Sequence, residues 1–202
     1  MQPVILIADD HSLIRRGLML HMQFDMGYSD IHEVSSCSGL MGELVKKKYT
    51  HLVLDILLSD GNTLEIIPNI RRVYPDLQIL VFSMQPEEIY ANALQQYGIR
   101  HYLSKSAEEK EIIARLTKFL QNETTERNLP GVNPNNPFTA LSPRELEILH
   151  YMLKGSGTKE IAALFNIKMN TVSTLKNRIF EKTQSSNIRE LLELASLYNI
   201  NY

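Results

Sequence analysis

Four short apolar runs of the sequence each lead into a residue that could take part in chemistry. These residues supply three carboxylates, one hydroxyl and one ammonium: Asp9 and Asp10 after 4–8, Asp55 after 51–54, Ser83 after 78–82 and Lys105 after 101–104. In an open parallel sheet, ligands bind beyond the carboxyl ends of the strands. If the four runs are neighbouring strands, these groups meet at one sheet edge. The set predicts a site for one magnesium ion and one phosphoryl group.

The carboxylates suit Mg²⁺, which takes oxygen ligands and is usually bound by one or two carboxylates plus a phosphate. We expect Asp9 and Asp10 to anchor the ion, and Asp55 both to bind it and to attack a phosphoryl group. The main-chain carbonyl of Leu57 could complete the ligand set. His11 follows the acidic pair, but Mg²⁺ prefers oxygen, so we expect His11 to be a loop or first-turn residue.

The other two residues suit the phosphoryl group itself. Phosphoryl transfer depends on positioning and on neutralising charge, which Lys105 and the Ser83 hydroxyl would provide. A lone Asp at a strand end is usually a turn residue or a helix N-cap. The joint occurrence of four such strand ends favours the phosphoryl site over that interpretation.

The elements that must position these residues alternate between strand and helix. Strand patterns lie near 3–8, 29–35, 51–54, 78–82 and 99–103, and helical patterns near 11–24, 38–48, 63–73, 86–97 and 107–121. Such alternation is typical of βα units around a parallel sheet. We therefore predict an α/β domain over 1–121, with a doubly wound five-stranded parallel sheet of the flavodoxin-like kind.

The pattern changes after residue 121. Residues 122–137 contain three prolines, five asparagines and a glycine, which predicts a linker without regular structure. Residues 138–202 show helical periodicity throughout and predict an all-α domain of four helices. Its helices are expected near 142–153, 158–165, 170–182 and 187–198, the first beginning with a capping box at Ser142 and Glu145.

Composition and charge narrow the class of protein. Hydrophobic residues make up 44% and charged residues 22% of the chain, as in globular proteins. No apolar run approaches the roughly 20 residues that span a bilayer. The N-terminus has no charged n-region or cleavage site, and Cys37 is the single cysteine. We therefore expect a cytoplasmic protein that does not bind membranes.

The charge is unevenly distributed along the chain. Residues 1–137 carry a net charge of −4, whereas residues 138–202 carry +2 and residues 154–182 carry +4. A basic segment in an acidic chain indicates a polyanionic partner. The helices at 158–165 and 170–182, separated by a short turn, predict a helix-turn-helix whose second helix enters the major groove of DNA. A protein-interaction module with a solvated basic face is the alternative.

The acidic pair, the phosphoacceptor position, the hydroxyl and the lysine resemble the receiver domain of a two-component response regulator. The resemblance implies that Asp55 accepts a phosphoryl group from a sensor histidine kinase with Mg²⁺ as cofactor. It also implies that Tyr102, three residues before Lys105, is an aromatic switch residue that follows Ser83. Such a switch would lead to a homodimer on activation.

The sequence departs from the usual receiver pattern at four positions. Ser59 stands where receivers usually have Pro, and Thr63 stands where they usually have Gly. His101 replaces a small residue, and Ser106 follows the lysine where many receivers have proline. These changes affect loop geometry rather than the charged groups, so they bear on the rate and lifetime of phosphorylation.

The C-terminal helices resemble the LuxR/NarL-type DNA-binding domain in the stretches 141–145, 159–162 and 171–182. The resemblance implies base contacts from Ser173, Thr174 and Asn177. The full set of expected DNA-binding residues is Lys159, Thr171, Ser173, Thr174, Lys176, Asn177, Arg178 and Lys182. The apolar stripe of the last helix could mediate dimerisation on DNA or only close the domain core; its members are Leu191, Leu194 and Tyr198.

These observations predict a DNA-binding transcription regulator, controlled by phosphorylation at Asp55, and not an enzyme. Two alternatives stay open. The receiver could be degenerate and work without phosphorylation, for which Ser59 and Thr63 give some support. Less expected is a magnesium-dependent phosphatase with an aspartate nucleophile, because such enzymes have a second Asp two residues after the nucleophile, where this chain has Leu57.

Overall fold

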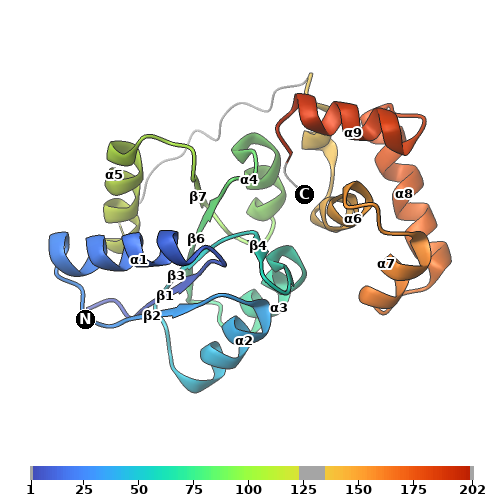
Figure 1. Ribbon diagram of the computed structural model, residues 1–202. Coiled ribbons are helices and arrows are strands. Elements are labelled where there is room, and N and C mark those ends of the chain that lie inside the picture. The colour runs from blue at the N-terminus through green and yellow to red at the C-terminus, as the bar shows by residue number, and fades with distance from the viewer. Residues whose placement is uncertain (1, 123–134, 201–202) are drawn as a thin grey trace. The chain divides into compact units, whose positions relative to one another are not determined.

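The structure, a computed structural model, describes residues 2–122 and 135–200 (Figure 1). Contacts divide these residues into two units. The first contains residues 2–84 and 95–122, and the second contains residues 85–94 and 135–200. The predicted linker falls mostly on residues 123–134, which lie outside the described residues. The predicted domain boundaries at 121 and 138 stay a prediction.

A five-stranded parallel sheet forms the centre of the first unit. Its strands are β1 (Ile5–Ala8), β2 (Ile31–Val34), β3 (His51–Leu54), β6 (Gln78–Ser83) and β7 (His101–Ser104). They lie in the order β2-β1-β3-β6-β7, and every neighbouring pair is parallel. The chain therefore has the doubly wound sheet that the sequence predicts, and β1, β3, β6 and β7 are consecutive neighbours in it.

Helices accompany the strands in chain order: α1 (Ser12–Leu20), α2 (Cys37–Lys46), α3 (Ile67–Val73), α4 (Glu87–Gln95) and α5 (Glu109–Leu120). The predicted helix at 11–24 ends in a π-helical turn, η1 (His21–Asp25), and the one at 63–73 begins with a 3₁₀ turn, η2 (Thr63–Glu65). By its contacts α4 groups with the second unit, although it follows β6 in the chain.

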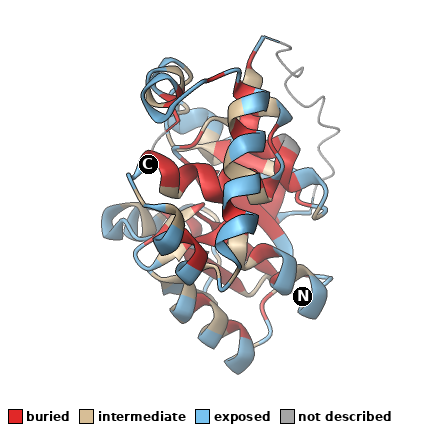
Figure 2. Cartoon of the chain, turned by 90° about the vertical axis from the view of Figure 1, so that its right-hand side faces the viewer, coloured by how far each residue is buried: buried red, intermediate tan, exposed pale blue. Residues whose placement is uncertain are grey.

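Alternate residues of each strand point to opposite faces of the sheet. One face carries Ile5, Ile7, Val53, Leu80 and Leu103, which form a buried cluster with side chains of α1 and α5. The colours of Figure 2 show buried strands and helices whose buried and exposed residues alternate. This periodicity is the signal from which the strands and helices could be predicted.

One small element of the first unit was not predicted. Strands β4 (Leu57–Leu58) and β5 (Gly61–Asn62) form an antiparallel hairpin directly after β3 and Asp55. A hairpin of two-residue strands is too short to show alternation in the sequence. It fixes the loop that follows the expected phosphoacceptor.

The second unit contains the predicted four helices: α6 (Pro143–Leu153), α7 (Thr158–Leu164), α8 (Met169–Thr183) and α9 (Ile188–Leu197). Both halves of the Ser142–Glu145 capping box are formed at the start of α6. A 3₁₀ turn, η3 (Pro137–Ala140), precedes them and begins inside the range predicted as linker. Among the described residues, no helix is long and apolar enough to cross a membrane.

Candidate functional site

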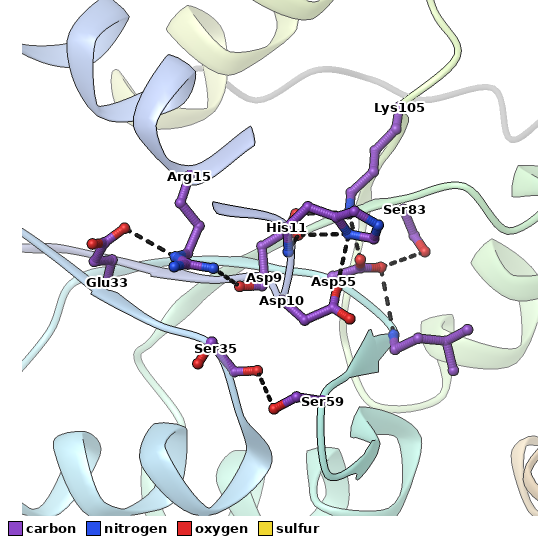
Figure 3. A network of polar contacts seen from close by, with 11 residues as sticks. Asp9, Asp10, His11, Arg15, Glu33, Ser35, Asp55, Ser59, Ser83 and Lys105 are labelled. Atoms are coloured by element: carbon purple, nitrogen blue, oxygen red, sulfur yellow. Dashed lines mark hydrogen bonds and ion pairs between the residues drawn. The ribbon is translucent and has the colours of Figure 1, made fainter. Parts of the chain in front are cut away.

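The chemically active residues of the first unit meet at the carboxyl ends of four neighbouring strands (Figure 3). Asp9 follows β1, Asp55 follows β3, Ser83 ends β6 and Lys105 follows β7. The N–H group of Asp55 donates to the Ala8 carbonyl at 2.8 Å, which keeps the ends of β1 and β3 level. The parallel sheet therefore brings together residues that are up to 96 positions apart in the sequence.

The ammonium group of Lys105 lies between two carboxylates. Its Nζ is 2.7 Å from Oδ2 of Asp9 and 2.5 Å from Oδ2 of Asp55, and all three side chains are at most 5% exposed. A buried charge requires a partner. Lys105 therefore balances part of the negative charge of the site, and it lies where it could contact oxygens of a phosphoryl group on Asp55.

The carboxyl group of Asp55 has a pKa above its usual value. Burial raises this pKa most, and the nearby Asp9 adds to the effect, whereas Lys105 and the hydrogen bond from Ser83 oppose it. The Ser83 hydroxyl donates to Oδ1 of Asp55 at 2.6 Å. Additional positive charge at the site would favour the ionised, nucleophilic form of Asp55.

Asp10 and His11 complete the polar cluster. Asp9, Asp10, His11 and Asp55 each offer one ligand atom, and these four atoms lie within 4.8 Å of one another. The three carboxylates are hard oxygen donors converging on one point, which fits Mg²⁺. His11 is the N-cap residue of α1, which agrees with the loop or first-turn position expected from the sequence.

The contacts of the His11 ring were missed from the sequence. Its Nδ1 lies 2.8 Å from Oδ1 of Asp10 and 3.3 Å from Oδ1 of Asp9. Arg15 is a second missed contributor, because its guanidinium donates to the Asp9 main-chain carbonyl at 2.7 Å and to Glu33 at 2.9 Å. The spacing of these residues in the sequence does not predict either contact, because both depend on the direction in which α1 follows β1.

The two remaining site residues are Leu57, which contacts Asp55, and Tyr102, which lies on β7. The Leu57 N–H donates a long hydrogen bond of 3.4 Å to Oδ1 of Asp55, so the peptide group between Ile56 and Leu57 adjoins the acidic cluster. The Leu57 carbonyl as a metal ligand stays a prediction. Tyr102 pairs with Val81 across β7 and β6 and is buried. Strand alternation directs Tyr102 to the face opposite Leu103.

In the second unit, α7 and α8 form the predicted helix-turn-helix, with Asn166 in the left-handed region at the turn. Seven of the eight expected DNA-binding residues are exposed: Lys159, Thr171, Ser173, Thr174, Asn177, Arg178 and Lys182. Lys176 is half-buried, and its Nζ donates to the Thr158 hydroxyl at 3.3 Å. The structure therefore presents the polar residues of α8 on an accessible surface.

Lys182 has a different environment from the other cations of α8. Its Nζ lies 2.6 Å from Oε2 of the buried Glu145 and 3.1 Å from the Ala140 carbonyl. Burial would raise the pKa of Glu145, but hydrogen bonds from Lys182 and Ser142 outweigh it and lower this pKa. These contacts favour a structural role for Lys182, joining α8 to the start of α6.

The apolar stripe of α9 is divided between core and surface. Leu191 is fully buried in the unit, so it offers no surface to a second copy. Leu194 and Tyr198 are half-buried, and the Tyr198 hydroxyl donates to the Asn135 carbonyl at 2.8 Å. The burial of Leu191 supports the core role, one of the two roles that the sequence left open, and dimerisation through this stripe stays a prediction.

Comparisons with known proteins agree with this geometry. The family of response regulator receiver domains matches residues 5–117, and the family of bacterial regulatory proteins of the luxR type matches residues 139–195. The oxygen regulatory protein NreC of Staphylococcus carnosus (strain TM300) is 31% identical over 213 residues. Its counterpart from Staphylococcus haemolyticus (strain JCSC1435) is 30% identical, and each alignment covers 95% of both chains.

Solved structures of RcsB from Salmonella enterica serovar Typhimurium are similar in fold. One is bound to the promoter P1flhDC in the presence of the phosphomimetic BeF₃⁻ and has a TM-score of 0.84 at 23% identity, covering 98% of this chain and 100% of that chain. Another, bound to the promoter rprA, has a TM-score of 0.79 at 22% identity, covering 98% and 99%.

Proposed function

The chain belongs to the response regulators that carry a receiver domain followed by a LuxR-type DNA-binding domain, and on this premise we propose that a phosphoryl group on Asp55 controls DNA binding and transcription. The observation that carries the proposal is the buried Asp55 carboxylate, which lies between Lys105 and Ser83 and beside Asp9. The proposed nucleophile, Asp55, is thus in contact with a positive charge from Lys105 and a hydrogen-bond donor from Ser83.

In the proposed reaction, one Asp55 carboxylate oxygen attacks the phosphorus of a phosphohistidine of a sensor kinase or of a small acyl phosphate. An aspartyl O–P bond forms, and the bond from phosphorus to the donor group breaks. Lys105 stabilises the negative charge on the transferred oxygens. Mg²⁺, when bound, would neutralise further charge there, held by Asp9, Asp10, Asp55 and the Leu57 carbonyl.

The phosphoryl group would act through Ser83 and Tyr102. It replaces a carboxylate oxygen as the acceptor for the Ser83 hydroxyl and brings additional negative charge to Lys105. A change in these contacts alters the balance between two states of the surface around β6 and β7. We propose that one of these states forms a homodimer and binds promoter DNA more tightly.

DNA recognition would come from α8. Ser173, Thr174 and Asn177 are exposed and carry groups that can read base edges in the major groove. Lys159, Lys176 and Arg178 would bind phosphates, with Thr171 beside them. Solved structures that resemble this chain include RcsB bound to promoter DNA and RcsB dimers bound to DNA, which supports binding as a dimer. The half-buried Leu194 and Tyr198 of α9 would contribute to the contact between the two copies.

One observation favours a second candidate, a regulator that works without phosphorylation. Ser59 and Thr63 stand where receivers usually have Pro and Gly, and both lie in the segment that follows Asp55. Phosphatase turnover has less support, because Leu57 occupies the position where such enzymes carry an acid. Steady hydrolysis of an aryl phosphate, well beyond one equivalent per chain, would favour the enzyme.

Mass spectrometry after incubation with acetyl phosphate and Mg²⁺ tests the proposal. We expect the full-length protein to gain one phosphoryl group that hydroxylamine removes, as an acyl phosphate requires. Asp55→Asn should gain none while keeping its fold by circular dichroism. Stable phosphorylation of Asp55→Asn, or no uptake by the wild type, would contradict the assignment of Asp55.

A further inference from the structure

Thr63 makes direct contact with the main chain of the phosphoacceptor. It is fully buried, and its hydroxyl oxygen lies 2.9 Å from the carbonyl oxygen of Asp55 and 3.1 Å from that of Ile56. The Thr63 N–H donates to the same Ile56 carbonyl at 2.8 Å. The single hydroxyl proton is thus available to the Asp55 carbonyl, the Ile56 carbonyl or both.

The hairpin between Asp55 and Thr63 is anchored at its tip as well. The Ser59 hydroxyl donates to the Ser35 carbonyl at 2.9 Å. The Asp60 carboxylate accepts hydrogen bonds from the N–H groups of Cys37 and Ser38, at 2.5 and 3.0 Å, and so caps the start of α2. Negative charge is favourable at a helix N-terminus. The hairpin that follows Asp55 is therefore held both at its tip and at Thr63.

These contacts bear on the position of the reacting carboxylate. The Asp55 side chain accepts hydrogen bonds from Ser83 and Lys105, and the position of its carboxylate also depends on its own main chain. A hydrogen bond to the Asp55 carbonyl restricts rotation of the peptide group that follows it. The same segment carries Leu57, whose N–H donates to the Asp55 carboxylate.

We propose that Thr63 is a positioning residue for phosphoryl transfer, acting through the main-chain carbonyls of Asp55 and Ile56. The inference rests on the proposed function of Asp55 and deepens it. A glycine, the residue usual at this position in receivers, has no hydroxyl and cannot make this contact. In this chain the Thr63 hydroxyl can donate a hydrogen bond to the main-chain carbonyl of Asp55, and this bond restrains the main chain there.

The test compares three variants of the full-length protein with the wild type. Thr63→Val removes the hydroxyl and keeps the volume, and Thr63→Ser keeps the hydroxyl. Thr117→Val is the matched control, since the Thr117 hydroxyl donates to the Ile113 carbonyl at 2.8 Å inside α5, away from the site. For each protein we would measure thermal unfolding and the initial rate of phosphoryl uptake from acetyl phosphate at saturating Mg²⁺.

We expect Thr63→Val to take up phosphoryl groups more slowly by on the order of 10-fold, because small misplacements of a nucleophile are costly. Thr63→Ser should keep most of the wild-type rate of phosphoryl uptake. Thr117→Val should lower the thermal stability and leave this rate unchanged. A folded Thr63→Val protein with the wild-type rate would overturn the inference alone. A wild-type protein that takes up no phosphoryl group would contradict the proposed function, and with it the role of Thr63.

Discussion

Ser83 donates a hydrogen bond of 2.6 Å to Oδ1 of Asp55, so the expected switch hydroxyl already lies against the expected phosphoacceptor. Tyr102, on the neighbouring strand, is buried at the same time. A phosphoryl group on Asp55 would offer new acceptor oxygens to the Ser83 hydroxyl. This exchange of acceptor is the central step of the proposed switch.

Substitution of Ser83 should therefore separate phosphorylation from its consequence. We expect Ser83→Ala still to gain one phosphoryl group, because Asp55 and Lys105 are retained. Its gain in DNA affinity on phosphorylation should fall several-fold, because the link to β6 is lost. Ser104→Ala is the matched control, since Ser104 pairs with Ser83 at the end of β7. Equal gains in DNA affinity for wild type and Ser83→Ala would contradict this role.

Substitutions in α8 should divide into two classes. Lys176→Ala and Arg178→Ala should weaken binding to all DNA sequences, and each should reduce the slope of log K against log salt by roughly 0.9. Asn177→Ala should instead change the preference among sequences, because an amide can read base edges. Fluorescence anisotropy with several duplexes over a salt series would measure both effects. Retention of full affinity in all three variants would place the DNA-binding surface elsewhere.

Lys182 and Lys159 should behave in opposite ways. Removal of the Lys182 ammonium leaves the buried Glu145 without its cationic partner, so Lys182→Ala should lower the free energy of unfolding by about 2 kcal/mol. Lys159 is exposed, so Lys159→Ala should leave stability unchanged and reduce DNA affinity. Urea unfolding and DNA titration of both variants check the contrast. A stable Lys182→Ala protein with weakened DNA binding would restore Lys182 to the expected DNA contacts.

His150 should make the stability of the second unit depend on pH. Burial, helped by the nearby Lys154, lowers the pKa of His150 from 6.5 to about 4, so the folded state keeps the ring neutral where the unfolded state binds a proton. Its contribution is complete above pH 6.5 and is lost as the pH falls from 6.5 towards about 4. Between about pH 7 and pH 5 this amounts to about 2 kcal/mol.

The comparison that isolates His150 uses His150→Leu. Urea unfolding of both proteins at the two pH values gives the pH-dependent part of each stability, and the other histidines contribute equally to both proteins. The variant should lose less stability on acidification than the wild type. An equal loss in both proteins would show that His150 is not the titrating group.

The sheet and the strand-end residues were predictable because they follow from local patterns. Four apolar runs predicted β1, β3, β6 and β7, and the parallel sheet required that Asp9, Asp55, Ser83 and Lys105 meet at one edge. The contacts of Thr63 were not predictable, since they depend on a hairpin of two-residue strands. Whether the ammonium group of an α8 lysine contacts a buried carboxylate, as that of Lys182 does, depends on tertiary packing, which helical periodicity does not specify.

Titration of the full-length protein with beryllofluoride and Mg²⁺, followed by measurement of its affinity for promoter DNA and of its oligomeric state, tests the central claim most directly. The account predicts that the wild type dimerises and binds DNA more tightly, and that Asp55→Asn responds in neither respect. An unchanged wild type, or an Asp55→Asn protein that responds as the wild type does, would contradict control by phosphorylation at Asp55.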